Sequence, residues 1–372
     1  MKSFQYGDEK ISKNQLMLAI PSVILGVDIL QLPKDLAVDM DGADGWIVLI
    51  VGGAISLFLV WIMTRLALRF PKQTFFSYAT SIVSKKVAIV LTFLFAVLFI
   101  GLAAFDIRVL GHTSQQYLFD NTPVEVVSLS FLFVVVYAIS GSRAALFRLN
   151  MMFFPIIITV LLFVLLVNVK WVELSNLMPA FQTDVKGFGG GLKTSVLVYG
   201  GYSIVLFYLA LVDQPKKASK HMMFGMVTPI VLYLLVYLFS LMIFGRTATS
   251  HLLYPTIDLA KRIEIPGGIL ERVEALFFIV WTMGVFAATI IAFDVAILAL
   301  NSIFKRMKKI HFVLILSPIV YYLALFPKDI SEVNMFGEII RSAMVAFSSI
   351  TVVALFLIAK LRKVGGNDNA SK

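Results

Sequence analysis

The chain has 372 residues, of which 59% are hydrophobic and 15% are charged, and its mean hydropathy is +0.92. Globular chains average about 45–50% apolar and about 25% charged residues, and a soluble domain of this size cannot bury so much apolar surface. The composition therefore predicts an integral membrane protein. The formal net charge of +10 falls in short loops, where it is expected to set topology and to meet anionic lipid, and we expect no nucleic-acid partner.

The residue types also argue against several kinds of site. Cysteine is absent, which excludes disulfides, thiolate nucleophiles and sulfur-ligated metals. The four histidines lack metal-ligand spacing, and the sequence has no hydrolase triad, phosphate-binding loop or paired-carboxylate pattern. We therefore expect no enzyme, no catalytic residue, no metal and no cofactor.

Apolar segments long enough to cross the membrane recur along the chain. A helix spans about 30 Å of hydrocarbon with about 20 apolar residues. Ten segments approach this length and predict an all-α protein with ten transmembrane helices in one membrane domain, residues 16–360. Residues 1–15 and 361–372 are expected to be cytoplasmic. The spans are residues 16–32, 46–64, 87–105, 126–140, 149–169, 194–212, 222–244, 275–293, 312–326 and 342–359.

Lys and Arg are distributed unequally between the two sides. With the N-terminus inside, the inner segments hold about twice as many as the outer ones, which predicts cytoplasmic N- and C-termini. Two outer segments are long. Residues 170–193 contain Gly189-Gly190-Gly191 and are expected to form a loop. Residues 246–272 include a stretch at 254–264 whose apolar spacing predicts a short interfacial helix.

Glycine interrupts the first and sixth predicted spans, at Gly26 and at Gly200-Gly201. Small residues often serve only close helix packing. However, breaks at these two places are typical of transporters with inverted five-helix repeats, here residues 16–169 and 194–360. Unwound backbone at that depth must line a cavity, and half-helix ends hold carboxylates or cations. The candidate ligand-binding residues are Ile24, Gly26, Val27, Asp28, Leu98, Gly101, Leu102, Tyr199, Gly200, Gly201, Ser203 and Trp281.

Ionisable residues within spans are costly and need a reason. Asp28 follows the first break, either as a counter-ion or proton carrier or as a hydrated residue near the outer interface. Asp106 and Arg108 fall at the predicted outer end of the third span, at the interface or paired with the first or eighth span. These residues are candidates for a gating or polar network.

The eighth span contributes three more candidates to that network. Glu271 and Glu274 open it, where acidic residues favour the helix dipole or act as an outer gate. Asp294 lies in its inner part, and Asn301 lies seven residues on. The two are candidates for a cytoplasmic proton or ion route.

Short motifs in a consistent order suggest a family. They are ISKNQL at residues 11–16, DGWI at 44–47, NLMP at 176–179, YPTI at 254–257 and ERVE at 271–274. In order and spacing, from about residue 10 to about residue 360, the chain resembles the spore-germination receptor B-subunits, also called germination permeases. That family is similar to the amino acid–polyamine–organocation transporters.

The resemblance implies a leucine-transporter-like fold, residence in the endospore inner membrane, and association with the A and C subunits of a germination receptor. It implies that the protein binds a nutrient germinant, usually an amino acid, and that binding triggers germination through a conformational change. The alternative is an amino acid permease, possibly proton-coupled. A scaffold whose pocket binds nothing and an ion or water conduit also stay open.

The first break departs from the transporter pattern. Amino acid transporters of this superfamily usually carry Gly-x-Gly there, whereas Asp28 occupies the second glycine position. The departure implies either that the ligand is displaced from the break or that Asp28 holds its amine.

Overall fold

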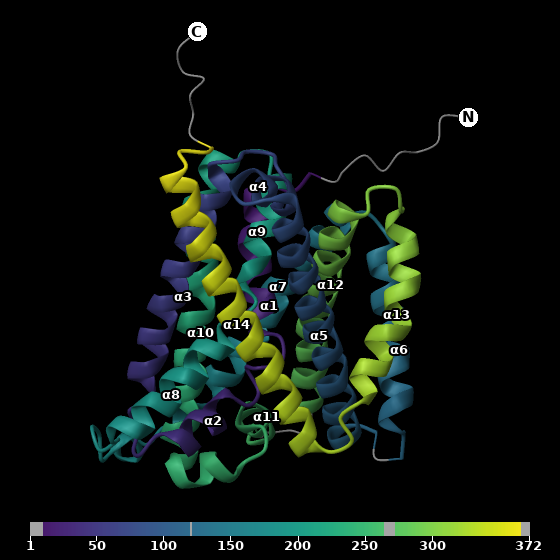
Figure 1. Cartoon of the computed structure of the whole chain (residues 1–372). Coiled ribbons are helices and arrows are strands. Elements are labelled where there is room, and N and C mark those ends of the chain that lie inside the picture. The colour runs from purple at the N-terminus through teal and green to yellow at the C-terminus, as the bar shows by residue number, and fades with distance from the viewer. Residues whose placement is uncertain (1–9, 120, 264–271, 366–372) are drawn as a thin grey trace.

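The computed structural model describes residues 10–119, 121–263 and 272–365, and their regular structure is helical (Figure 1). In these ranges seven helices are long and apolar enough to cross a membrane, and two further apolar helices have 17 residues each. The ten-helix count and the five-plus-five repeat remain predictions. The seven are α3 (Gly45–Leu68), α5 (Lys85–Tyr117), α7 (Arg143–Val167) with its 3-10 extension η1 (Asn168–Trp171), α8 (Val185–Val198) with the segments up to Leu211, α10 (Pro215–His251), α12 (Val273–Ile303) and α14 (Ile330–Leu361), and the shorter two are α6 (Val124–Ser140) and α13 (Lys309–Leu325).

The first predicted span, residues 16–32, contains one helix, α1 (Lys13–Leu25), and the turns that follow it. The next helix, α2 (Leu32–Asp39), starts at the last residue of that span and extends beyond it. α1 starts with a capping box between Ser12 and Gln15, which satisfies two backbone N–H groups that have no helical partner. It ends at Gly26, where a Cβ atom would lie 2.9 Å from the Cβ of Ala288. The predicted interruption is confirmed, and glycine permits the close approach of α12.

The sixth span is interrupted after α8. Gly201 adopts a left-handed conformation with φ of 93°, which glycine tolerates far better than other residues. The chain then continues as η3 (Tyr202–Ile204), α9 (Val205–Tyr208) and η4 (Leu209–Leu211). Both breaks predicted from glycine are therefore present.

The prediction of a loop over residues 170–193 is wrong in its second half, because α8 begins at Val185. The Asp184 carboxylate caps the helix by accepting a hydrogen bond of 2.7 Å from the Gly187 N–H. A Cβ atom at Gly191 would lie 2.4 Å from the sulfur of Met40. Gly191 thus permits the close packing of α8 on its neighbours, whereas Gly189 faces open space.

Asp44 ties the segment between α2 and α3 to the segment before α8. Its carboxylate accepts hydrogen bonds from the backbone N–H of Phe181, at 2.6 Å, and of Thr183, at 3.1 Å. Burial of Asp44 opposes its ionisation, but these bonds outweigh it and hold the pKa of Asp44 below its usual value.

The helices form one bundle. α12 lies against α5 and α7, α10 lies against α3, and α1 lies against α10 and α12. In Figure 1, α6 and α13 stand together at one edge. Residues 10 and 365 lie at the same end of the bundle, called here the termini side, together with α4 (Phe75–Ile82), while α2 and the short helix α11 (Pro255–Lys261) lie at the opposite side. α11 confirms the short helix predicted within residues 254–264.

Aromatic packing fixes the second half of the broken sixth span. The ring of Phe207 lies 5.0 Å from Phe75, 5.4 Å from Phe95 and 6.0 Å from Phe99 between centroids. These aromatic pairs hold α9 against α4 and α5. On the periphery, by contrast, apolar side chains such as Phe133 and Ile350 are 64% and 70% exposed, as expected for surfaces that face lipid rather than water.

Candidate functional site

Three side chains hold the backbone of the first break. The Tyr233 hydroxyl donates to the Ile24 carbonyl at 2.5 Å, the Trp281 indole N–H to the Gly26 carbonyl at 2.8 Å, and the Thr256 hydroxyl to the carbonyl of residue 29 at 2.6 Å. They come from α10, α12 and α11. Carbonyls freed by the break are therefore satisfied by neighbouring helices, as burial in a membrane protein requires.

A small enclosed cavity of about 20 Å³ lies between the two breaks. This is room for about one water molecule, so a larger ligand requires the surrounding helices to move. The lining comes from the first break, α5, the second break and α14. Its residues are Val23, Ile24, Val27, Asp28, Leu102, Phe105, Asp106, Leu197, Gly200, Gly201, Arg341 and Met344.

An ion pair between Asp28 and Arg341 joins the first break to α14 at this cavity. The guanidinium also lies over the ring of Phe105, 5.3 Å from its centroid. Both charged side chains are largely buried, at 14% and 15% exposure. The interfacial, hydrated interpretation of Asp28 is thereby wrong, since a buried guanidinium is its partner.

Asp106 brings a second carboxylate to the cavity. It is 4% exposed and accepts a hydrogen bond of 3.3 Å from Thr289 of α12. The predicted end of this helix at residue 105 is wrong, because α5 continues to Tyr117, so Asp106 lies inside the bundle rather than at an interface. The alternative prediction, a partner on the eighth span, is confirmed. The cavity thus holds two carboxylates and one guanidinium, and burial makes an unbalanced charge costly.

The other predicted ligand-binding residues divide into three groups. Ile24, Val27, Leu102, Gly200 and Gly201 line the cavity together with Asp28, whereas Gly26 and Trp281 adjoin it through their hydrogen bond. Leu98, Gly101, Tyr199 and Ser203 do not line it: Gly101 packs on Ile340, Tyr199 donates to the Leu49 carbonyl at 3.2 Å, and Ser203 donates to the sulfur of Met344 at 3.5 Å.

The outer members of the predicted polar network lie elsewhere. Arg108 is buried and donates to the Lys328 carbonyl at 3.3 Å. Glu274 pairs with Arg272 at 3.1 Å at the start of α12, and Glu271 lies outside the described residues. Neither Arg108 nor Glu274 lines the cavity.

Asp294 forms a second buried cluster, toward the termini side. It is fully buried, and its carboxylate lies 2.8 Å from Arg143 Nε, 3.3 Å from Lys309 Nζ and 2.9 Å from the Tyr208 hydroxyl. Tyr208 belongs to α9, the others to α7 and α13. The cluster therefore fastens the second half of the broken sixth span to the surrounding helices. Among the residues that the structure describes, Asn301 forms no hydrogen bond or ion pair with this cluster.

Sequence reasoning missed Arg341, Phe105, Leu197, Val23 and Met344. The tenth span was predicted to start at residue 342, whereas α14 starts at Ile330. Arg341 was therefore placed at a helix end instead of at the depth of the breaks. The only signal for Arg341 in the sequence was that a single basic residue borders an apolar run.

Comparison with known proteins supports these observations. A family model described as spore germination protein matches residues 10–333. Spore germination protein GerLB of Bacillus cereus is 36% identical over 374 residues, covering all of both chains. Spore germination protein YndE of Bacillus subtilis is 28% identical and covers 96% of this chain and 98% of its own length.

Two solved transporters share the fold. MhsT in complex with L-phenylalanine superposes with a TM-score of 0.71 at 11% identity, over 94% of this chain and 89% of its own. Mhp1, a nucleobase-cation-symport-1 family transporter in a closed conformation with bromovinylhydantoin bound, gives 0.68 at 13% identity, over 98% and 83%. These likenesses show the fold alone.

The family follows from the sequence comparisons. Since the family model covers most of this chain and a full-length relative exceeds one-third identity, the chain belongs to the spore germination permease family.

Proposed function

We propose that the protein is the nutrient-binding subunit of a spore germination receptor and that it binds an amino acid between its two helix breaks. The observation that carries the proposal is the cavity lined by both breaks, in which Asp28, Asp106 and Arg341 meet. A zwitterionic amino acid offers one cation and one anion to such a set. Membership of the germination family and the shared fold with an amino-acid-bound transporter support it.

The ligand's two charged groups have distinct partners in this proposal. The carboxylate takes a bidentate hydrogen bond from Arg341, which suits planar carboxylates. The ammonium pairs with Asp106, whose carboxylate accepts a hydrogen bond from the Thr289 hydroxyl. The ligand side chain meets Leu102 and Met344.

Binding competes with the existing Asp28–Arg341 pair. When the ligand takes the guanidinium, the link between the first break and α14 loosens, which favours a different arrangement of the broken helices. The shift is no larger than the ligand's differential affinity for the two arrangements. In this proposal the A and C subunits, in the endospore inner membrane with the termini side in the cytoplasm, respond to that shift. Residues 16–360 would act as one ten-helix domain of two inverted repeats.

The experiment is a nutrient dose response of spores that carry Asp106→Asn or Arg341→Gln, with protein levels checked. Removing one partner of a buried charge pair costs about 2–5 kcal/mol, so at least about thirtyfold more nutrient is expected. Asp258→Asn on α11, away from the cavity, is the matched control. Parental dose responses from both cavity variants would refute the site.

A proton-coupled amino acid permease is the second candidate, favoured by the buried carboxylate of Asp106 and by the transporter fold. Uptake of a labelled amino acid by the protein alone in proteoliposomes, stimulated by a pH gradient and lost in Asp106→Asn, would establish it. A response confined to the complete receptor would instead establish the sensor.

A further inference from the structure

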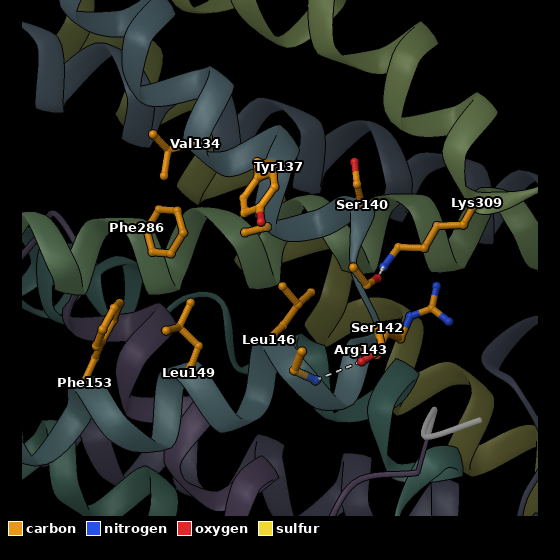
Figure 2. Close-up of a pocket in the computed structure, with 13 residues that line it drawn as sticks. Val134, Tyr137, Ser140, Ser142, Arg143, Leu146, Leu149, Phe153, Phe286 and Lys309 are labelled. Atoms are coloured by element: carbon orange, nitrogen blue, oxygen red, sulfur yellow. Dashed lines mark hydrogen bonds between the residues drawn. The ribbon is translucent and has the colours of Figure 1, made fainter. Parts of the chain in front are cut away.

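A wide groove opens on the side of the bundle, away from the cavity between the breaks (Figure 2). It measures about 1010 Å³ and lies between α6, α7, α12 and the start of α13. We call it the lateral groove. Its lining residues include Val134, Tyr137, Arg143, Phe286 and Lys309.

One end of the lateral groove is apolar. Figure 2 shows Phe286 of α12 facing Phe153 and Leu149 of α7, with Val134 of α6 above them. Val134 is 54% exposed and Tyr137 is 83% exposed. In a chain that spans the bilayer, such exposed side chains on the middle of a helix meet hydrocarbon, so the groove opens toward lipid.

The other end is cationic. Lys309 Nζ donates to the Gly141 carbonyl at 2.9 Å and lies 3.3 Å from Asp294, and Arg143 pairs with the same carboxylate. The segment between α12 and α13 adds Lys305, Arg306 and Lys308 beside Lys309. This end lies on the termini side, where the bundle meets the membrane surface.

We propose that the lateral groove is a binding site for one anionic phospholipid. The acyl chains lie along Phe286, Phe153 and Leu149, and the phosphate lies at Lys309 beside Gly141. Along the membrane normal, the groove presents first an apolar wall, then a polar turn and then a basic cluster. A phospholipid presents its acyl chains, glycerol and phosphate in the same order. The exposed basic residues Lys305, Arg306 and Lys308 at this end favour an anionic headgroup over a zwitterionic one.

The first experiment measures lipid binding to the full chain in detergent by native mass spectrometry. The probes are phosphatidylglycerol and phosphatidylcholine of equal chain length. Removing one positive charge near a membrane surface costs about fivefold in affinity for anionic lipid. Lys309→Gln is therefore expected to bind phosphatidylglycerol about fivefold more weakly. Lys86→Gln, an exposed lysine at the start of α5 on the same side, is expected to match the parent.

The second experiment fills the groove without changing charge. Ala145 lines it and is exposed, so Ala145→Trp occupies the space without crowding the core, whereas Ala54→Trp places the same ring on an exposed site of α3 outside it. Loss of bound phosphatidylglycerol in the first variant alone supports the site. Equal affinity for the two lipids, or undiminished binding by Ala145→Trp, overturns it. So do crosslinks in spores from a photoreactive residue at Tyr137 to another subunit instead of lipid.

Discussion

Replacing Arg341 by glutamine tests the electrostatics of the cavity most directly. The substitution removes the guanidinium that pairs with Asp28 and covers the ring of Phe105, and it leaves Asp28 and Asp106 without a cation. Breaking a buried pair from one side costs about 3–5 kcal/mol. The lost contact with the aromatic ring adds about 0.5–2 kcal/mol. Both side chains are about 15% exposed, so solvent screens the pair only slightly.

A double-mutant cycle isolates the pair. Asp28→Asn, Arg341→Gln and the double variant are unfolded by denaturant in the same detergent, and the free energies of unfolding are compared. Because the double variant no longer contains either charge, it is expected to lose less stability than the sum of the singles, by about 1–3 kcal/mol. Strictly additive losses would refute the reasoning, since they would mean that the two side chains do not interact in the folded protein.

Other substitutions test the surroundings of the site. Phe207→Ala removes the ring at the centre of the aromatic cluster on α9 and is expected to lower the free energy of unfolding by about 3–5 kcal/mol; a loss below about 1 kcal/mol in denaturant titration would contradict that packing. Gly201→Ala forces a side chain onto a backbone with φ of 93° and within 2.8 Å of Val23, so a loss of at least about 1 kcal/mol is expected, whereas Gly189→Ala, with no atom within 4 Å, should be neutral or stabilising. Asp44 has a lowered pKa in the folded protein, so its contribution to stability is present above the unfolded pKa of about 4 and is lost as the pH falls below it. Asp44→Asn should therefore reduce the loss of unfolding free energy between neutral and acidic pH. An unchanged dependence of the unfolding free energy on acidic pH would exclude this role.

The sequence predicted the fold well where local chemistry decides it. Gly26 and Gly200-Gly201 mark the two breaks because buried, unwound backbone tolerates few other residues. The glycines at 189–191 misled the prediction for the same reason in reverse. The run lies in a helix in which Gly191 permits close packing, and a single sequence does not distinguish that use of glycine from a loop.

The site was harder to predict because its charges meet across the chain. The sequence left Asp28 open as a counter-ion, a proton carrier or a hydrated residue near the outer interface, because its partner Arg341 lies 313 positions later. Hydropathy alone places a charged residue such as Arg341 at the end of an apolar run rather than inside a helix. For the same reason, Asp106 was predicted either at an interface or paired with the first or eighth span, and the structure decides for the eighth span. Pairing between distant helices is a property of packing, which neither periodicity nor composition reports.

The size of the cavity between the breaks has a kinetic consequence. Under the proposed function, an amino acid enters a cavity with room for about one water molecule only after the helices separate, so association follows opening instead of causing it. The observed rate of ligand binding should then level off with nutrient concentration, at the rate of opening itself. A receptor of this kind answers abundant nutrient no faster than its own fluctuations allow, and the delay before a spore commits would reflect the protein more than the supply.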